Sequence, residues 1–299
     1  MTLTGTIDVD CTLGEGPVWD DRLHRLWWTD IQESRLYFWD WQDRKASWVA
    51  VPERLGSLGL TSDSEWLICA FASGFALFHP GRGETRWLAR PERTYRGIRF
   101  NDGRVDRSGN FWSGTMVEDS GLAGGAEGAL YRLSPAGDMQ SLVDRIGISN
   151  GLAWSADGKT QWFADSSCRT IWRFNHEAGS ARLTDRQNFA ELPEGRAPDG
   201  SEVDAAGCLW NAEWGGSQVV RYRDDGTVDC KFDLPVSQPT CLAFGGPDLD
   251  HIFVTTAHEG LDPARREAEP LAGKVLILRT GHVGLLSPKF PIENEGKPQ

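Results

Sequence analysis

The stretch "EGPVWDDRLHRLWWTD", residues 15–30, holds two short apolar segments separated by a tight polar turn. Its second segment, "RLWWTD" at residues 25–30, is followed from Arg35 by a third, "RLYFWDW". Apolar and polar residues alternate at period two in these segments, and turn-forming residues bound them, which is typical of β-strands. The stretch therefore predicts a small sheet of short strands.

The same pattern recurs five more times along the chain. The further segments are "GSLGLTSDSEWLICAF" from Gly56, "NDGRVDRSGNFWSGTM" from Asn101, "NGLAWSADGKTQWFAD" from Asn150, "DGSEVDAAGCLWNAEW" from Asp199 and "TCLAFGGPDLDHIFVTT" from Thr240. Counted from Glu15, the six starts are spaced by 41, 45, 49, 49 and 41 residues. Repeats of about 40–50 residues with four short strands each are the signature of a propeller. We therefore predict an all-β fold, a six-bladed β-propeller.

The regular spacing disfavours a pair of β-sandwiches or an irregular all-β fold. No linker-like segment divides the chain, so one propeller domain is expected over residues 1–299. The N-terminal "TGTIDVDCTL" is expected to add an outer strand to the last blade and so close the ring.

The composition limits the partners that the chain can have. A formal net charge of −12 disfavours nucleic-acid binding, because phosphate contacts need a basic surface. No apolar run approaches the ~18 residues of a membrane span, and the N-terminus lacks a signal-peptide pattern, so no membrane partner is expected. The six cysteines form no Cys-x-x-Cys pair, which favours free thiols in a reducing cytoplasm. Both a monomer and a small homo-oligomer remain open.

The repeats place polar residues at equivalent positions near the propeller axis. In a propeller the first strand of each blade lines the central channel, so the residues just before these strands face one another at one end of the channel. Here they are Glu15, Gly56, Asn101, Asn150, Asp199 and Thr240. Two carboxylates gathered in a small space usually need a cation or a shared proton. Oxygen ligands of this kind suit a divalent ion, so we predict a metal site in the central channel.

Simpler interpretations of these residues exist. Asn and Asp open turns because their side chains bond nearby backbone, and Asn150-Gly151 fits such a turn. Glu15 has no such preference, and it favours the metal site. The motif Gly-x-Ser-x-Gly at residues 147–151 is followed by strand residues rather than the helix of a nucleophile elbow. The six histidines fall at no equivalent repeat position.

Tryptophans also recur in the repeats, and blade packing explains them better than sugar stacking. They include Trp19, Trp112, Trp154, Trp162 and Trp210. The "RLWWTD" segment is similar to a signature of extracellular receptor propellers, which are binding modules without chemistry. It is interpreted as scaffold, with Asp30 bonded to a turn, while the functional site lies in the channel.

Four segments resemble the senescence-marker-protein/regucalcin/gluconolactonase family in order and spacing. They are "GEGPVW", "RFNDGRVDRSGNFWSGTM", "ISNGLAWSADG" and "PDGSEVDAAGCLW". The resemblance extends from about Cys11 to about Arg279 and implies a six-bladed propeller that holds one divalent metal and hydrolyses sugar lactones. The metal ligands of the family match Glu15, Asn150 and Asp199, the residues that the repeats also select.

The resemblance also implies which residues contact the substrate. Arg99 and Asn101, in "RFND", match the substrate-contacting Arg and Asn of the family. A further acidic residue of the family falls on Asp119, with Glu118 beside it, so the sequence leaves open which of the two reaches substrate. The alternative for Arg99 is a salt bridge to a nearby carboxylate such as Asp102.

These residues lead to one mechanistic hypothesis. The metal acts as a Lewis acid on the carbonyl of an aldono-1,4- or 1,5-lactone, and Asp199 is the general base for water. The cofactor is one divalent ion, whether Ca²⁺, Zn²⁺, Mn²⁺, Mg²⁺ or Fe²⁺, and the partner is a small-molecule sugar lactone. The alternatives are a divalent-metal phosphotriesterase on the same scaffold and a non-catalytic calcium-binding or protein-binding propeller.

Overall fold

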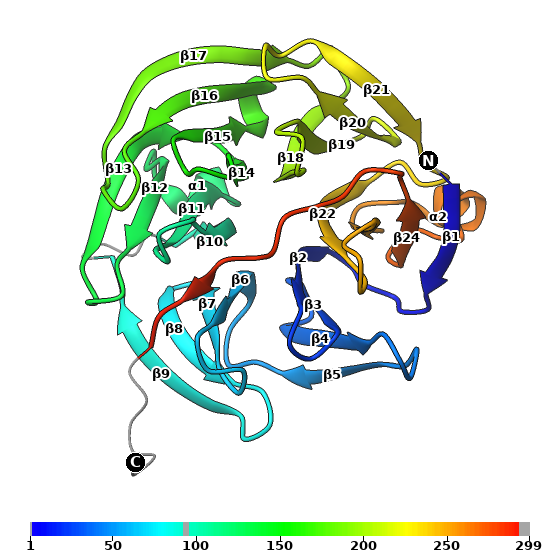
Figure 1. The fold of residues 1–299 in the computed structure, drawn as a ribbon, viewed down its shortest axis with the longest axis horizontal. Coiled ribbons are helices and arrows are strands. Elements are labelled where there is room, and N and C mark those ends of the chain that lie inside the picture. The colour runs from blue at the N-terminus through cyan, green and yellow to red at the C-terminus, as the bar shows by residue number, and fades with distance from the viewer. Residues whose placement is uncertain (1, 92–95, 293–299) are drawn as a thin grey trace.

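The computed structural model of the protein describes residues 2–91 and 96–292. In this part of the chain, six β-sheets surround a central axis as the blades of a propeller (Figure 1). Five of these sheets have four strands and one has five. The predicted six-bladed β-propeller is confirmed.

The blades follow one another along the chain, and each runs from an inner to an outer strand. The first comprises β2 (Gly14–Asp20), β3 (Arg25–Asp30), β4 (Arg35–Asp40) and β5 (Ala46–Ala50). The second comprises β6 (Leu55–Thr61), β7 (Leu67–Phe71), β8 (Gly74–His79) and β9 (Glu84–Ala89). The third comprises β10 (Ile98–Val105), β11 (Phe111–Val117), β12 (Gly128–Leu133) and β13 (Met139–Ile146).

The remaining blades continue the pattern. The fourth comprises β14 (Ser149–Trp154), β15 (Thr160–Asp165), β16 (Thr170–His176) and β17 (Leu183–Glu191). The fifth comprises β18 (Ala197–Val203), β19 (Leu209–Trp214), β20 (Gln218–Tyr222) and β21 (Val228–Asp233). The sixth comprises β22 (Pro239–Gly245), β23 (His251–Thr256), β24 (Val275–Arg279) and β1 (Thr2–Ile7).

Helical segments are few and short in the described residues. They are α1 (Ser120–Ala123), the 3-10 turn η1 (Ser166–Cys168) and α2 (Pro263–Ala268). None of the helices found there has the length and apolar character needed to cross a membrane.

The N-terminal strand closes the ring. β1 pairs antiparallel with β24, placing Thr6 opposite Leu276 and Ile7 opposite Val275. The sixth blade is therefore built from both ends of the chain, as the sequence predicted. Because the outer strand comes from the beginning of the chain, opening the ring requires breaking this pairing.

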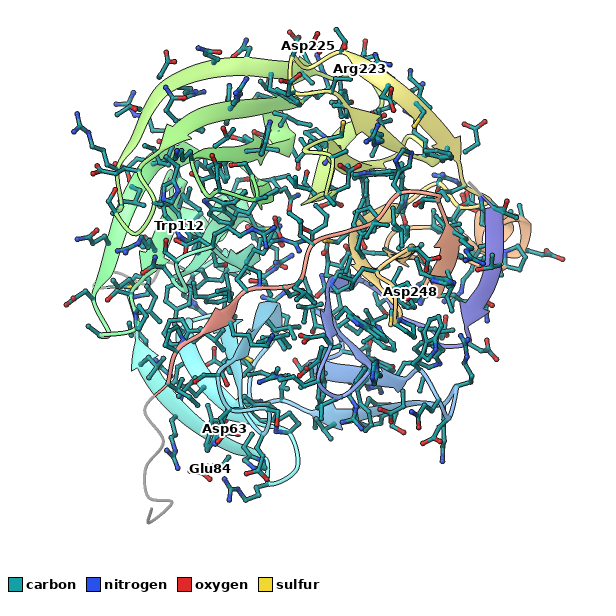
Figure 2. All side chains as sticks on the ribbon, viewed as in Figure 1. Asp63, Glu84, Trp112, Arg223, Asp225 and Asp248 are labelled. Atoms are coloured by element: carbon teal, nitrogen blue, oxygen red, sulfur yellow. The ribbon has the colours of Figure 1, made fainter. Side chains whose placement is uncertain are left out.

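The repeated tryptophans pack within and between the blades, as predicted. Trp19, Trp112, Trp154, Trp162 and Trp210 are all almost fully buried. Figure 2 shows Trp112 inside the molecule, with Glu84 and Asp225 at its edge. The carboxylate of Asp30 accepts hydrogen bonds from the backbone N–H groups of Thr12 and Leu13, at 2.9 and 3.1 Å. This confirms that "RLWWTD" is scaffold.

Every inner strand contains a register shift near its beginning. The shifts lie between Glu15 and Val18, Leu55 and Ser57, Phe100 and Gly103, Asn150 and Ala153, Pro198 and Ser201, and Pro239 and Leu242. The six equivalent positions, five of them polar, lie beside or within these irregularities, inside the inner strands rather than just before them as predicted. Bulges re-aim side chains, and the repetition turns one set of residues toward the axis.

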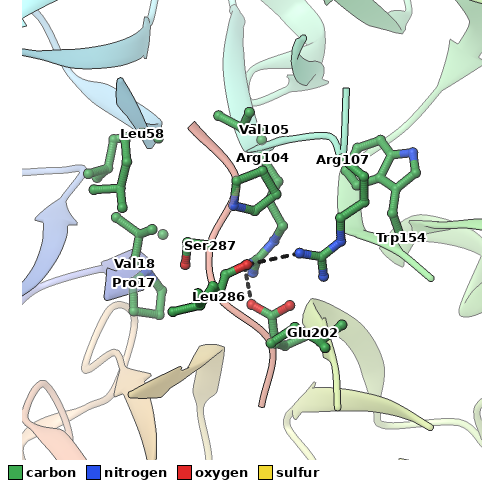
Figure 3. Close-up of a pocket in the computed structure, with 16 residues that line it drawn as sticks. Pro17, Val18, Leu58, Arg104, Val105, Arg107, Trp154, Glu202, Leu286 and Ser287 are labelled. Atoms are coloured by element: carbon green, nitrogen blue, oxygen red, sulfur yellow. Dashed lines mark hydrogen bonds and ion pairs between the residues drawn. The ribbon is translucent and has the colours of Figure 1, made fainter. Parts of the chain in front are cut away.

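A C-terminal strap, residues 283–290, crosses the axis at the other end of the inner strands (Figure 1). Its last residues form β25 (Lys289–Phe290), which pairs parallel with the end of β6. Arg107 donates a hydrogen bond of 2.9 Å to the carbonyl of Leu286 in the strap. A small cavity of about 20 Å³ lies beneath it, beside the ion pair of Arg104 and Glu202 (Figure 3). The strap narrows the channel here, which favours access from the opposite end.

Candidate metal centre and substrate cavity

Five of the predicted site residues line one cavity of about 290 Å³. They are Glu15 on β2, Arg99 and Asn101 on β10, Asn150 on β14 and Asp199 on β18. All five are buried. These five residues come from four separate blades, and the cavity lies where the inner strands begin.

The acidic side chains at the base of the cavity resist ionisation. Burial raises the pKa of Glu15 to about 8, and the nearby Asp102 carboxylate adds to this rise. Burial, followed by the charges of Glu15 and Asp102, raises the pKa of Asp199 well above its ordinary value. A bound cation would stabilise both carboxylates in their ionised form.

Hydrogen bonds hold Asn150 so that its amide oxygen can join the carboxylates of Glu15 and Asp199 as a third oxygen ligand. Its Nδ2 donates to Ser166 Oγ at 2.8 Å, and Ser166 Oγ donates to the carbonyl of Pro198 at 2.6 Å. Its Oδ1 accepts from Asn101 Nδ2 at 2.9 Å. A carbonyl oxygen has a second lone pair, so this bond leaves Asn150 able to contact a cation.

The residues present fit a divalent cation. Glu15, Asn150 and Asp199 offer only oxygen donors, and they line the same buried cavity. Hard divalent ions prefer such mixed carboxylate and amide sets. Burial raises the pKa of both Glu15 and Asp199, and a cation bound between them would offset that cost of ionisation.

Arg99 is fixed on two sides of its guanidinium group. Its Nε donates to Glu118 Oε1 at 3.0 Å, and its Nη1 donates to Asn101 Oδ1 at 2.6 Å. It also donates to the carbonyl of Phe100 at 3.1 Å. The carboxylate partner of Arg99 is therefore Glu118 rather than Asp102. The Asp102 carboxylate instead accepts from the backbone N–H of Leu152 at 3.0 Å.

The two acidic neighbours left open by the sequence occupy different places. Glu118 pairs with Arg99 and also with Arg54. Burial opposes ionisation of Glu118, but hydrogen bonds and charge from these two arginines lower its pKa. Asp119 instead caps helix α1, where its Oδ1 accepts from the backbone N–H of Leu122 at 2.9 Å. Neither acid is among the residues that line the cavity.

The cavity also has residues that the sequence did not reveal. Ser166, Trp214 and Glu259 line it, and none lies at the start of an inner strand. Ser166 follows β15, and Glu259 lies in the loop after β23. The repeat alignment could have indicated Ser166, since it directly follows the second strand of its blade. Glu259 lies in a loop without a repeat equivalent, so alignment gave no signal for it.

A comparison with protein families identifies the family of the chain. Residues 13–258 match the family described as "SMP-30/Gluconolactonase/LRE-like region". The chain belongs to this family. The matched range contains all seven site residues predicted from the sequence, so members of the SMP-30/gluconolactonase family provide the relevant comparison.

Similar members of the SMP-30/gluconolactonase family include named lactonases. A pentonolactonase of Haloferax volcanii is 35% identical over 274 residues, covering 91% of this chain and 91% of that protein. A 6-deoxy-6-sulfogluconolactonase of Pseudomonas putida is 34% identical over 295 residues, covering 97% and 98%.

A solved structure shares the fold closely. It is described as a calcium-binding protein, regucalcin, from Agrobacterium tumefaciens. The two chains superpose with a TM-score of 0.90 at 31% sequence identity, covering 96% of this chain and 97% of the other. The two chains therefore share the propeller fold over nearly all of the residues compared.

Proposed function

We propose that this protein hydrolyses a sugar lactone, an aldono-1,4- or 1,5-lactone, to the aldonic acid with one divalent metal ion. The observation that carries the proposal is the buried set of Glu15, Asn150 and Asp199 in a cavity shared with Arg99 and Asn101. Membership of the SMP-30/gluconolactonase family and the two named lactonases support the same reaction class.

Glu15, Asn150 and Asp199 are the residues that would hold the metal. When bound there, a divalent ion supplies Lewis-acid polarisation of the lactone carbonyl. Ca²⁺, Mg²⁺, Mn²⁺, Zn²⁺ and Fe²⁺ all accept oxygen ligands, so metal identity is a question for measurement.

Asp199 is proposed as the general base. Its carboxylate accepts a proton as the oxygen of a water molecule bonds to the carbonyl carbon. The bond from that carbon to the ring oxygen then breaks, and the proton passes to the ring oxygen, which leaves as a hydroxyl group. One lactone and one water thereby give one aldonic acid.

Arg99 and Asn101 are proposed to hold the sugar. Glu118 and Asn101 occupy the Nε and Nη1 donors of Arg99. Its Nη2 group remains available for a ring hydroxyl or the product carboxylate, since no hydrogen bond is formed by it within the described residues. A planar guanidinium suits both ligands. Asn101, beside Arg99 in the same cavity, is placed to contact a sugar hydroxyl.

We also propose a cytoplasmic location and a monomer or small homo-oligomer. All six cysteines are free thiols. Free thiols are the ordinary state in a reducing compartment. Size-exclusion chromatography with light scattering would measure the number of subunits.

The test is a lactone hydrolysis assay on protein stripped with a chelator. A pH indicator would report acid release from a panel of pentono- and hexonolactones and from a phosphotriester, with each divalent ion added back separately. We expect turnover that depends on the added ion. A bound ion without turnover on any lactone would contradict the proposal and favour a binding propeller, while turnover confined to phosphotriesters would favour the phosphotriesterase.

A further inference from the structure

An arginine outside the cavity is attached to the substrate-facing Arg99 through a shared carboxylate. Arg54 lies directly before β6, and its two terminal nitrogens donate to the two oxygens of Glu118 at 2.6 and 2.7 Å. Glu118 Oε1 also accepts from Arg99 Nε at 3.0 Å. One carboxylate on the third blade thus bridges a guanidinium at the rim and a buried guanidinium in the cavity.

We propose that Arg54 is a positioning residue for sugar binding, which acts by fixing Glu118 and through it the orientation of Arg99. This inference rests on the proposed lactonase function and names a further residue for it. A two-pronged arginine–carboxylate pair restricts the orientation of both groups more than a single hydrogen bond does. The carboxylate cannot rotate freely, and the Nε edge of Arg99 stays where Glu118 holds it.

The backbone around Arg54 is itself held in place. The Arg54 carbonyl accepts from the backbone N–H of Ala72 at 2.8 Å. The preceding Glu53 accepts hydrogen bonds from the backbone N–H and the hydroxyl of Ser73, at 3.0 and 2.9 Å. The connection between the first two blades is therefore anchored to the second blade, and it supports Arg54 as a fixed point.

Further hydrogen bonds continue around the rim from Arg54. Its Nη1 contacts Gln32 Oε1 at 3.4 Å, and Gln32 Nε2 donates to Glu259 Oε1 at 2.6 Å. On the other side, Arg99 donates a hydrogen bond to Asn101, and Asn101 donates one to Asn150. Arg54 is thus one link in a chain of contacts that runs from the sixth blade, through the first, to the fourth, and this chain borders the cavity.

The Arg54–Glu118 pair is not explained by an ordinary role in surface stability. The side chains of Arg54 and Glu118 are 33% and 29% exposed, and pairs with such exposure contribute little to folding. The first blade contains another two-pronged arginine–carboxylate pair of similar exposure, neither member of which lines the cavity. Arg25 donates to both oxygens of Asp40 at 2.7 and 3.1 Å, with side chains 26% and 25% exposed.

The experiment compares Arg54→Met, Glu118→Leu and the double variant with wild type, in the metal-loaded lactonase assay. Arg25→Met is the control. If Arg54 orients Arg99 for binding, Arg54→Met should raise KM roughly 3- to 10-fold, while kcat stays within about twofold. In the Glu118→Leu background, the same change should alter KM by less than about twofold, because leucine has no acceptor for either arginine and the route to Arg99 is already broken.

Arg54→Lys provides the second variant. It keeps the charge but loses the two-pronged geometry, so its KM should lie between those of wild type and Arg54→Met. If Arg54→Met does not fold, the comparison of single and double variants at residues 54 and 118 is made with Arg54→Lys instead.

An unchanged KM, an equal KM effect in both Glu118 backgrounds, or the same effect from Arg25→Met would overturn the role of Arg54. Those results differ from failure of the proposed function, in which wild type itself turns over no lactone. That failure would remove the role of Arg54 in sugar binding as well.

Discussion

At the scale of single residues, Glu15 couples the cavity to pH. Its pKa rises from an ordinary value of 4.5 to about 8 because it is buried, with Asp102 nearby. Between these two values the folded metal-free protein keeps a proton that the unfolded chain has released. The contribution of Glu15 to folding stability is therefore at its full value below the pKa of Glu15 in the unfolded chain. It is lost as pH rises through the pKa of Glu15 in the folded protein.

This predicts that metal-free protein loses thermal stability as pH rises from about 5 to about 8.5, by several degrees in Tm. Glu15→Gln removes one of the two cavity carboxyl groups whose pKa burial raises, so it should make this dependence shallower. A divalent ion should oppose the loss, because it binds the ionised carboxylates that form at higher pH. Melting curves of chelator-treated protein would measure each slope, and equal slopes for wild type and Glu15→Gln would contradict the pKa of Glu15.

The sequence predicted the cavity residues well where a repeat position defined them. Glu15, Asn101, Asn150 and Asp199 stand at equivalent positions, and the propeller brings all four together. The sequence could not decide whether Glu118 or Asp119 reaches substrate, since neighbouring residues in a chain can point in different directions. Their hydrogen bonds separate them, because Asp119 caps a helix and Glu118 pairs with arginines.

At the scale of elements, the strands could be predicted but the bulges in the inner strands could not. Alternating apolar residues mark a strand, whereas a bulge changes only the pairing with its neighbour. The strap was also missed. β25 has two residues and no counterpart in the repeats, so neither periodicity nor alignment indicates it.

The strap is expected to be held by one buried side chain. Phe290 is 2% exposed and packs in a core cluster with Trp66 and Phe111, while Leu286 in the same segment is 56% exposed. Phe290→Ala should lower the free energy of unfolding by about 3 kcal/mol. Leu286→Ala should change it by less than about 0.5 kcal/mol. Urea unfolding would measure both, and equal effects would contradict the docking of the strap through Phe290.

At the scale of the whole molecule, the propeller brings equivalent positions of the sequence repeats together at one site. Each blade contributes an inner strand, and the equivalent positions differ in chemistry while sharing a location. Glu15 and Asp199 provide acids, Asn101 and Asn150 provide amides, and the remaining blades provide Gly56 and Thr240. Because the N-terminal β1 pairs with β24 in the last blade, the relative placement of these residues depends on a closed ring.

The central claim is that Asp199 activates water beside a metal held by the same cavity. The most direct measurement is kcat for lactone hydrolysis by Asp199→Asn, together with its metal content. Asp225→Asn, in an exposed turn between β20 and β21, is the matched control. We predict a loss in kcat of about 100-fold or more with metal still bound, and no loss in the control. Full turnover by metal-loaded Asp199→Asn would contradict the account.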